Sequence, residues 1–246
     1  LDEVDCDAAN AVYDTLLLAE NKKLRRLELS NFSRDRALEP RSSLATLALR
    51  TKAKKITLSV PLHLRELSLG GSSLADVELD RASATECRDL VVAAEKMTAR
   101  SLFRILDGFS HLTSLTLCKA KSLDPDLTLN IPTVTTLKVE SCPTLKFLKV
   151  QGKRLRSVDL VRCSRLNHLG IFAPFLADLH LTTCSNVTDH LIDTTASSTF
   201  DTLQNVHVTG AKFVTPRFFV PFATSKNRRN ISLTMQRCDP SYKAKK

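Results

Sequence analysis

The chain has 246 residues, of which 43% are hydrophobic and 5% aromatic, and it contains no Trp. Its 36 Lys and Arg residues outnumber 26 Asp and Glu residues, which gives a formal net charge of +10. A long aliphatic chain with so few aromatic residues favours a repetitive core over a pocket that holds a cofactor. No run of about 18 uncharged apolar residues occurs, so we expect no membrane span.

Large aliphatic residues return along the whole chain at the first, fourth and sixth positions of a short unit. Eleven such units, 20 to 27 residues apart, begin at Leu1, Leu24, Leu44, Leu64, Cys87, Leu112, Val134, Leu155, Leu176, Leu203 and, in degenerate form, Arg228. Positions four and six point to the same side of an extended strand, because side chains alternate along it. Such a strand buries its apolar row only against copies of itself. The repeat therefore predicts a solenoid in which each unit covers its neighbours.

The length of each repeat indicates what closes its turn. The repeat that begins at Cys87 has room for a helix, and the stretch 93–109 carries apolar residues at helical spacing, namely Met97, Leu102, Ile105 and Leu106. Shorter repeats carry a second strand-like segment instead, at 56–58, 145–150 and 166–171. We therefore predict an α/β solenoid with a parallel concave sheet and a mixed convex side of helices and short strands. Residues 1–238 would form this repeat domain, and 239–246 a basic tail.

The repeat resembles the leucine-rich repeat, in its cysteine-containing subtype. In the best-matching stretch, 176–208, the ninth position is Cys184, and the residues that follow match the subtype's Cys-x-x-Ile-Thr-Asp-x-x-Leu run at Val187, Thr188, Asp189 and Leu191. Cys142 and Cys163 extend the ninth-position series, whereas the N-terminal half departs from it. The resemblance implies a leucine-rich repeat horseshoe that binds a protein on its concave sheet. It also suggests the substrate-recognition part of an F-box ubiquitin ligase, although these residues contain no convincing F-box motif.

The cysteines bear on the compartment and on the chemistry. There are seven, an odd number, with no Cys-x-x-Cys pair, which is atypical of a secreted disulfide framework or a zinc site. We interpret Cys142, Cys163 and Cys184 as small buried residues. We expect an intracellular protein, cytoplasmic or nuclear. The chain shows no signal peptide. Because it begins with Leu rather than Met, we expect a fragment of a longer chain, and an organelle is the alternative location.

The candidate binding residues follow from strand parity, because the third, fifth and seventh positions face solvent on the concave sheet. We predict that a protein partner contacts a row of mixed charge in the most regular repeats, formed by Lys138, Glu140, Asp159, Asp178, His180, Asn205 and His207. A metal or catalytic site is disfavoured there, since ligands in a flat row enclose no tetrahedral site. The chain also lacks a P-loop and a Gly-x-Ser-x-Gly motif. We therefore predict no enzyme activity, no cofactor and no small-molecule substrate.

The basic charge supports an alternative function. On the concave face, acids outnumber bases nine to three, so the excess of Lys and Arg must lie elsewhere. The candidate anion-binding residues are Lys52, Lys54, Lys55, Lys226, Arg228 and Arg229. They suggest a structural component of an RNA–protein assembly that contacts RNA with its basic outer surface. The concave rows lack the aromatic platforms on which RNA bases stack, so protein recognition is the leading hypothesis.

Overall fold

The computed structural model describes residues 3–6, 25–32, 37–38, 44–51, 55–58, 63–74, 76–79, 86–191, 201–223 and 231–238. The chain divides into two compact units, which we call unit 1 (Leu1–Ser122) and unit 2 (Leu123–Lys246). Each unit is a parallel-strand β-solenoid with little helix, in which a main sheet and a second, shorter sheet are joined by turns. The predicted solenoid is therefore confirmed.

Unit 1 places its main strands side by side in the order in which the repeats occur. These strands are β1 (Glu3–Cys6), β2 (Arg26–Phe32), β4 (Thr46–Thr51), β6 (Glu66–Ser73), β8 (Asp89–Lys96) and β9 (Ser114–Cys118). The second sheet consists of β3 (Ala37–Leu38), β5 (Lys55–Leu58) and β7 (Asp76–Leu79). Every strand pairing in the described residues of unit 1 is parallel, because the chain crosses back after each strand and starts the next one in the same direction.

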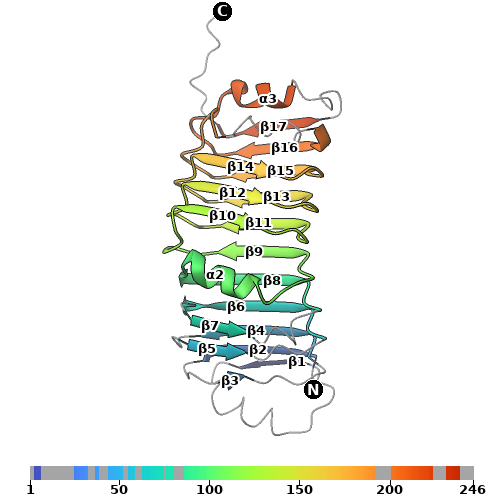
Figure 1. The fold of residues 1–246 in the computed structure, drawn as a ribbon. Helices are drawn as coiled ribbons and strands as arrows, with labels where there is room; N and C mark the ends of the chain where they lie inside the picture. Colours follow the sequence, from blue (N-terminus) through green and yellow to red (C-terminus); the bar gives the residue numbers. More distant parts are fainter. Residues whose placement is uncertain are drawn as a thin grey trace, which may run out of the picture. The chain divides into compact units, whose positions relative to one another are not determined.

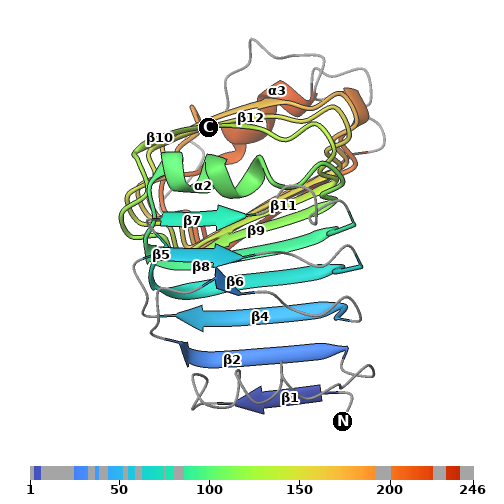
Figure 2. The same ribbon diagram turned by 60° about the horizontal axis from the view of Figure 1, so that its bottom comes forward.

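The helix α2 (Ala99–Leu106) of unit 1 packs beside β7, as Figure 2 shows. Thr98 caps its N-terminus by accepting a hydrogen bond from the backbone N–H of Ser101 at 3.2 Å, and Leu102 and Ile105 form its buried face. The sequence predicted a helix over 93–109, but 93–96 continue β8. Ala94 explains the difference, because it lies fully buried in the inward row of that strand.

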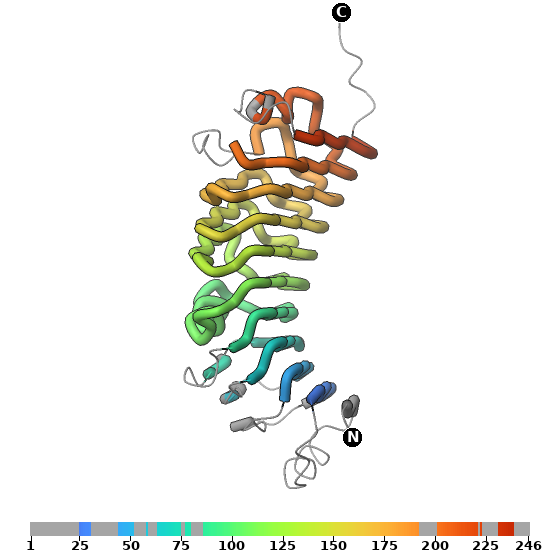
Figure 3. The backbone as a smooth tube through the Cα atoms, turned by 90° about the vertical axis from the view of Figure 1, so that its right-hand side faces the viewer, coloured from blue at the N-terminus to red at the C-terminus, as the bar shows by residue number. Residues whose placement is uncertain are grey.

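Unit 2 repeats the arrangement with shorter strands. Its main sheet consists of β11 (Thr136–Glu140), β13 (Ser157–Val161), β15 (Asp178–Thr182), β16 (Asn205–Thr209) and β17 (Ser232–Gln236). The second sheet consists of β10 (Asp126–Asn130), β12 (Phe147–Gln151) and β14 (His168–Phe172). A 3-10 turn η3 (Pro216–Phe219) and α3 (Val220–Ala223) follow β16. Figure 3 shows the successive turns stacked on one another.

The core of unit 2 lies between its two sheets. Leu179 and Leu181, at the fourth and sixth positions of their repeat, are completely buried, as are Leu148 and Val150 of the second sheet. Strand parity therefore orients the main strands as the sequence predicted. Leu233 and Met235 of β17 also point inward in register, yet they are 41% and 37% exposed.

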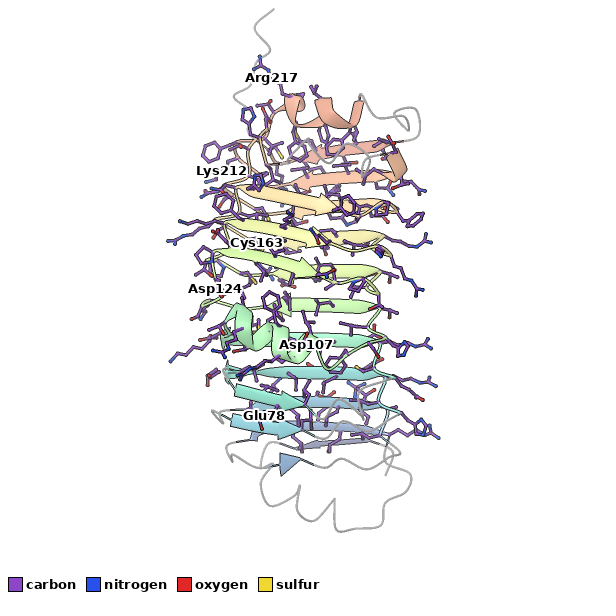
Figure 4. The ribbon with its side chains drawn as sticks, in the orientation of Figure 1. Glu78, Asp107, Asp124, Cys163, Lys212 and Arg217 are labelled. Atoms are coloured by element: carbon purple, nitrogen blue, oxygen red, sulfur yellow. The ribbon has the colours of Figure 1, made fainter. Side chains whose placement is uncertain are left out.

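A left-handed residue and a buried cysteine end the regular strands of unit 2. Ser141, Arg162 and Thr183 occupy the eighth position with φ between 53° and 56°, and a cysteine follows each of them. The Sγ of Cys184 donates to the carbonyl of Leu160 in the preceding repeat at 3.4 Å. Cys142, Cys163 and Cys184 are completely buried, so their interpretation as small buried residues is confirmed. Figure 4 labels Cys163.

The convex side departs from the leucine-rich repeat horseshoe that the sequence suggested. Second strands were predicted at 56–58, 145–150 and 166–171, and they form at Lys55–Leu58, Phe147–Gln151 and His168–Phe172. Three further short strands, β3, β7 and β10, occupy turns for which none was predicted. Short strands therefore dominate this side in the described residues, and α2 is an exception rather than an alternating element.

The start of the last repeat was also predicted wrongly. Val206 pairs with Leu233, so the inward residues of β17 are Leu233 and Met235 rather than Ile231 and Leu233. Cys238 then takes the ninth position, and its Sγ donates to the carbonyl of Gln236 at 3.4 Å, as the other ninth-position cysteines do. The unit therefore begins two residues after Arg228. The polar context of this stretch had hidden the pattern.

Several predicted features lie outside the described residues. These are Lys52, Lys54, Lys226, Arg228, Arg229 and the tail 239–246. Lys55 is the first residue of β5, and only its place on that strand is described. Within the described part of the chain, no helix has the length and apolar character needed to cross a bilayer.

Candidate functional site

The candidate site is the outward side of the main sheet in unit 2, which we call the main-sheet face. The third, fifth and seventh residues of each repeat form three rows across the strands. The first row is Thr136, Ser157, Asp178, Asn205 and Ser232; the middle row is Lys138, Asp159, His180, His207 and Thr234; the third row is Glu140, Val161, Thr182, Thr209 and Gln236. All seven residues predicted to bind a partner therefore share this face.

The middle row aligns two charges and two imidazole rings on consecutive strands. Lys138 is the register partner of Asp159, and His180 is the register partner of both Asp159 and His207. The rings of His180 and His207 lie edge to face, with centroids 6.0 Å apart. The Nε2 atom of His207 lies 2.6 Å from the hydroxyl of Thr209, which fixes the ring against the third row. All four side chains are half-buried, so neighbours enclose part of each one while the rest remains accessible.

Glu140 lies between two cations at one side of the face. Its Oε2 accepts from the Nζ of Lys138 at 3.1 Å, and its Oε1 accepts from the guanidinium of Arg162. The hydrogen bond from Lys138 is the largest cause that holds the pKa of Glu140 below its ordinary value of 4.5, and Arg162 adds to it. The carboxylate is therefore ionised and fixed in position.

Arg162 was not predicted as a site residue. It projects from the left-handed eighth position, and its Nε also donates to the hydroxyl of Ser141 at 3.2 Å. A basic residue at the eighth position, one repeat after an acidic seventh position, is the sequence signal that would have found it. Arg162 extends the ion-paired cluster beyond the strand ends.

The first row adds a hydrogen-bonded pair to the face. The side-chain amide of Asn205 donates to the Oδ1 of Asp178 at 2.6 Å. The two residues are register partners on β15 and β16. Asp178 is half-buried and Asn205 is exposed, so the pair presents both an acceptor and a donor to solvent. The predicted neighbours therefore lie together.

The corresponding face of unit 1 is hollowed, which sequence reasoning missed. A cavity of about 400 Å³ lies over β2, β4, β6 and β8, and small residues, Ala48 and Ser68, lie at its middle. Along the row of register partners Arg26, Thr46 and Glu66, the guanidinium of Arg26 pairs with Glu28 at 2.5 Å, and the hydroxyl of Thr46 donates to Glu66 at 3.2 Å. Small residues at the fifth position of consecutive repeats are the signal for this hollow.

The geometry of the main-sheet face limits what it can bind. Among the described residues, no group of three or more His, Cys, Asp and Glu side chains is arranged to hold a metal ion. The rows are flat and lie on rigid strands, so their donors and acceptors point outward together rather than around an enclosed point. Such a face can make directional contacts with an extended surface.

The fold and this face together define a parallel β-solenoid with an ordered polar sheet surface. No family model, curated protein or solved structure matches the chain. The function is therefore inferred from the residues themselves.

Proposed function

We propose that the chain is a non-enzymatic protein-recognition scaffold that binds a protein partner on the main-sheet face of unit 2. The observation that carries the proposal is the row Lys138, Asp159, His180 and His207, in register on four consecutive strands. Its side chains are half-buried, carry both signs of charge and are flanked by ion-paired or hydrogen-bonded neighbours.

Pre-organisation is the physical advantage of such a face. Ordering a long polar side chain on binding costs roughly 0.5–1.5 kcal/mol. Glu140 and Asp178 are already held by neighbours on the same sheet, so a partner meets part of the surface in its bound form. Mixed charges also discriminate between partners, because a like charge placed opposite Lys138 or Asp159 would be repelled.

The resemblance to leucine-rich repeat proteins suggests a narrower role. If the chain is the substrate-recognition part of a ubiquitin ligase, the main-sheet face would bind the substrate. That role rests on the resemblance alone, whereas the binding face rests on the geometry. The two therefore need separate tests.

The RNA–protein alternative finds less support on this face. Single-stranded RNA is usually recognised by bases that stack on aromatic rings. The three rows contain no Phe, Tyr or Trp, and His180 and His207 are their only rings. Of the basic residues proposed for anion binding, Lys55 alone lies in the described residues. The face therefore favours a protein partner.

A double charge reversal tests the proposal. Asp159→Lys combined with Lys138→Glu should weaken partner capture from a cell extract by at least about tenfold, since charge pairs across an interface lose their complements. The matched control makes the same two chemical changes at Asp126 and Lys212, exposed residues of unit 2 outside the main-sheet face; Figure 4 labels Lys212. Circular dichroism confirms that each variant is folded.

Capture that survives the double reversal would refute the main-sheet face as the binding site. Capture that is lost on neutralising Lys226, Arg228 and Arg229, and on nuclease treatment of the wild-type complex, would favour the RNA–protein alternative. Recovery of ubiquitin-ligase subunits in the same capture would support the ligase role separately.

A further inference from the structure

The outward side of the second sheet in unit 2 has a different chemistry from the main-sheet face. We call it the second-sheet face, and it is formed by alternate residues of β10, β12 and β14, namely Asp126, Thr128 and Asn130, then Phe147, Lys149 and Gln151, then His168, Gly170 and Phe172. The residues between them, such as Leu148 and Leu169, are completely buried. Strand parity therefore forces these nine residues toward solvent.

Phenylalanine rings are unusually exposed on and beside this face. Phe147 is 43% exposed, Phe172 is 57% exposed, and Phe175, in the turn after β14, is 58% exposed. Transfer of a phenyl ring out of water is favourable, so three exposed rings on and beside one sheet are a feature that the fold itself does not require. The ring of His168 lies beside that of Phe147, with centroids 5.7 Å apart.

The rings mark the two ends of the face. Phe147 begins β12, and Phe172 ends the neighbouring strand β14, where it is the register partner of Gln151. The two rings are therefore offset by four residues along the strand direction, or about 13 Å at the usual strand rise. Single-stranded nucleic acid stacked at about 3.4 Å per base would span that distance with about four nucleotides.

Cations lie between and around the rings. The stem of Lys149 lies against Gly170, since a Cβ added there would be 3.7 Å from its Cγ atom. Because Gly170 has no side chain, the surface between Phe147 and Phe172 is low and carries one positive charge, that of Lys149. Exposed Lys153 and Arg154 follow in the turn after β12, and Arg154 takes the position in its repeat that Phe175 takes in the next.

The acids near this face lie at one end of it. Asp124 and Asp126 are both exposed, and Asp126 is the register partner of Phe147. Exposed Lys146 immediately precedes Phe147. The strip from Lys149 to the turns that carry Lys153, Arg154 and Phe175 contains no Asp or Glu. Among the described residues of that strip, the exposed charges are therefore all positive.

We propose that the second-sheet face of unit 2 binds single-stranded nucleic acid, with bases stacked on Phe147 and Phe172 and phosphates paired with Lys149, Lys153 and Arg154. This class of ligand satisfies both features, because it alternates flat aromatic bases with a fixed negative charge on each nucleotide. An apolar protein surface would cover the rings but would leave the interspersed cations desolvated without partners. The site is separate from the main-sheet face and does not depend on protein recognition there.

Tryptophan substitution gives a direct readout, because the chain contains no Trp. Phe147→Trp and Phe172→Trp each introduce one tryptophan at a proposed stacking position. On titration with a single-stranded RNA of about twelve nucleotides, a length within known site sizes, both should lose fluorescence as bases stack on the indole. The matched control is Phe103→Trp on α2 of unit 1, where the native ring is 39% exposed and no stacking is proposed.

Affinity measurements separate stacking from charge. Phe147→Ala and Phe172→Ala should each weaken binding about tenfold, while Phe147→Tyr should retain it, because a phenol ring still stacks.

Lys149→Gln and Arg154→Gln should each reduce the slope of log affinity against log salt by about 0.7. Arg100→Gln, a similar change at an exposed position of α2, should leave the slope unchanged. Duplex RNA of the same sequence should bind at least about tenfold more weakly, since its base faces are not available.

Several results would overturn the proposal. These are the absence of RNA binding by the wild type, unchanged affinity in both Phe→Ala variants, and equal binding of single-stranded and duplex RNA. Equal quenching at position 103 would also overturn it, because contact would then be nonspecific. The variants alter exposed side chains only, so circular dichroism should show the wild-type fold in each of them.

Discussion

The two units differ in how their main strands end and the chain turns back. In unit 2 the main strands are five residues long, and a left-handed residue at the eighth position, as in Ser141, Arg162 and Thr183, ends each regular repeat. In unit 1 two of the main strands, β6 and β8, run for eight residues. β6 stays extended through Gly71, whose φ of 149° is accessible to glycine but rarely to other residues.

This difference shows what makes the repeats of unit 2 regular. The left-handed residue turns the chain inward, and the buried cysteine that follows donates to carbonyls of its own repeat and of the preceding one. In unit 1, β6 depends on local glycine geometry instead, whereas the five-residue strand β9 is followed by a left-handed residue, Lys119, as in unit 2. Regularity is therefore a property of the turn rather than of the leucine positions, which both units share.

The largest effect is expected where unit 1 depends on glycine. A Cβ added at Gly71 would lie 2.0 Å from the carbonyl oxygen of Thr51 on β4, and the positive φ would be strained as well. Gly71→Ala should therefore destabilise the chain by more than about 4 kcal/mol or prevent unit 1 from folding. Gly170→Ala is the matched control in unit 2, because its nearest neighbour is a flexible lysine stem and a change within about 1 kcal/mol is expected. Denaturant titration measures both, and similar values would contradict the comparison.

Truncation of the core should affect both units alike. Leu179→Ala in unit 2 and Leu67→Ala in unit 1 remove buried side chains at the fourth position and should each cost about 2–5 kcal/mol. His180→Ala, next to Leu179 but on the main-sheet face, should cost under about 0.5 kcal/mol. Urea unfolding curves provide the measurement. A His180→Ala effect as large as that of Leu179→Ala would mean that the strand register is wrong.

The buried cysteines Cys142, Cys163 and Cys184 should react only slowly with alkylating reagents in the folded protein. A hydrogen bond with Cys142, together with burial, raises the pKa of the Cys163 thiol to about 12, and only the thiolate reacts readily with alkylating reagents. Cys118 in unit 1 and Cys238 at the end of unit 2 are partly exposed. Mass spectrometry of alkylated peptides should show both reacting at least about tenfold faster than Cys142, Cys163 and Cys184. Equal rates under native conditions would show that the turns of unit 2 open easily.

The smallest effect concerns the ion-paired edge of the main-sheet face. The lowered pKa of Glu140 means that its ionised form stabilises the folded state above the ordinary value of 4.5, and that this contribution is lost as the pH falls through the lower, folded-state pKa. Glu140→Gln should therefore reduce stability by less than about 1 kcal/mol at neutral pH, and the deficit should shrink in acid. Unfolding free energies measured at neutral pH and below 4.5 test this. A deficit that grows in acid would contradict the assignment.

The sequence was sufficient for the strand register but not for the second side of the solenoid. The inward positions of the first ten units follow from a spacing that every strand with one buried face must obey. The short strands β3, β7 and β10 carry the same alternation over too few residues to be distinguished from turns. For the last unit, the inward residues Leu233 and Met235 lie in a polar context that favoured a different start.

The candidate site was predictable in its rows but not in its contacts. Strand parity alone placed His180 beside His207 and Lys138 beside Asp159 on one face. It could not show that Arg162 reaches Glu140, because that contact depends on the backbone angle of the residue after the strand. The hollow of unit 1 was missed for a related reason, since it arises from the absence of large side chains at Ala48 and Ser68.

The constant offset between strands in unit 2 makes chain length an evolvable quantity. From β10 to β12 to β14, and from β11 to β13 to β15, each register partner lies 21 residues further along the chain. If one such segment, for example 155–175, were duplicated or lost, every inward residue would still have an inward residue as its register partner, and both sheets would stay paired. Unequal recombination at this step could therefore lengthen or shorten the binding surface by whole rows without redesign of the interior.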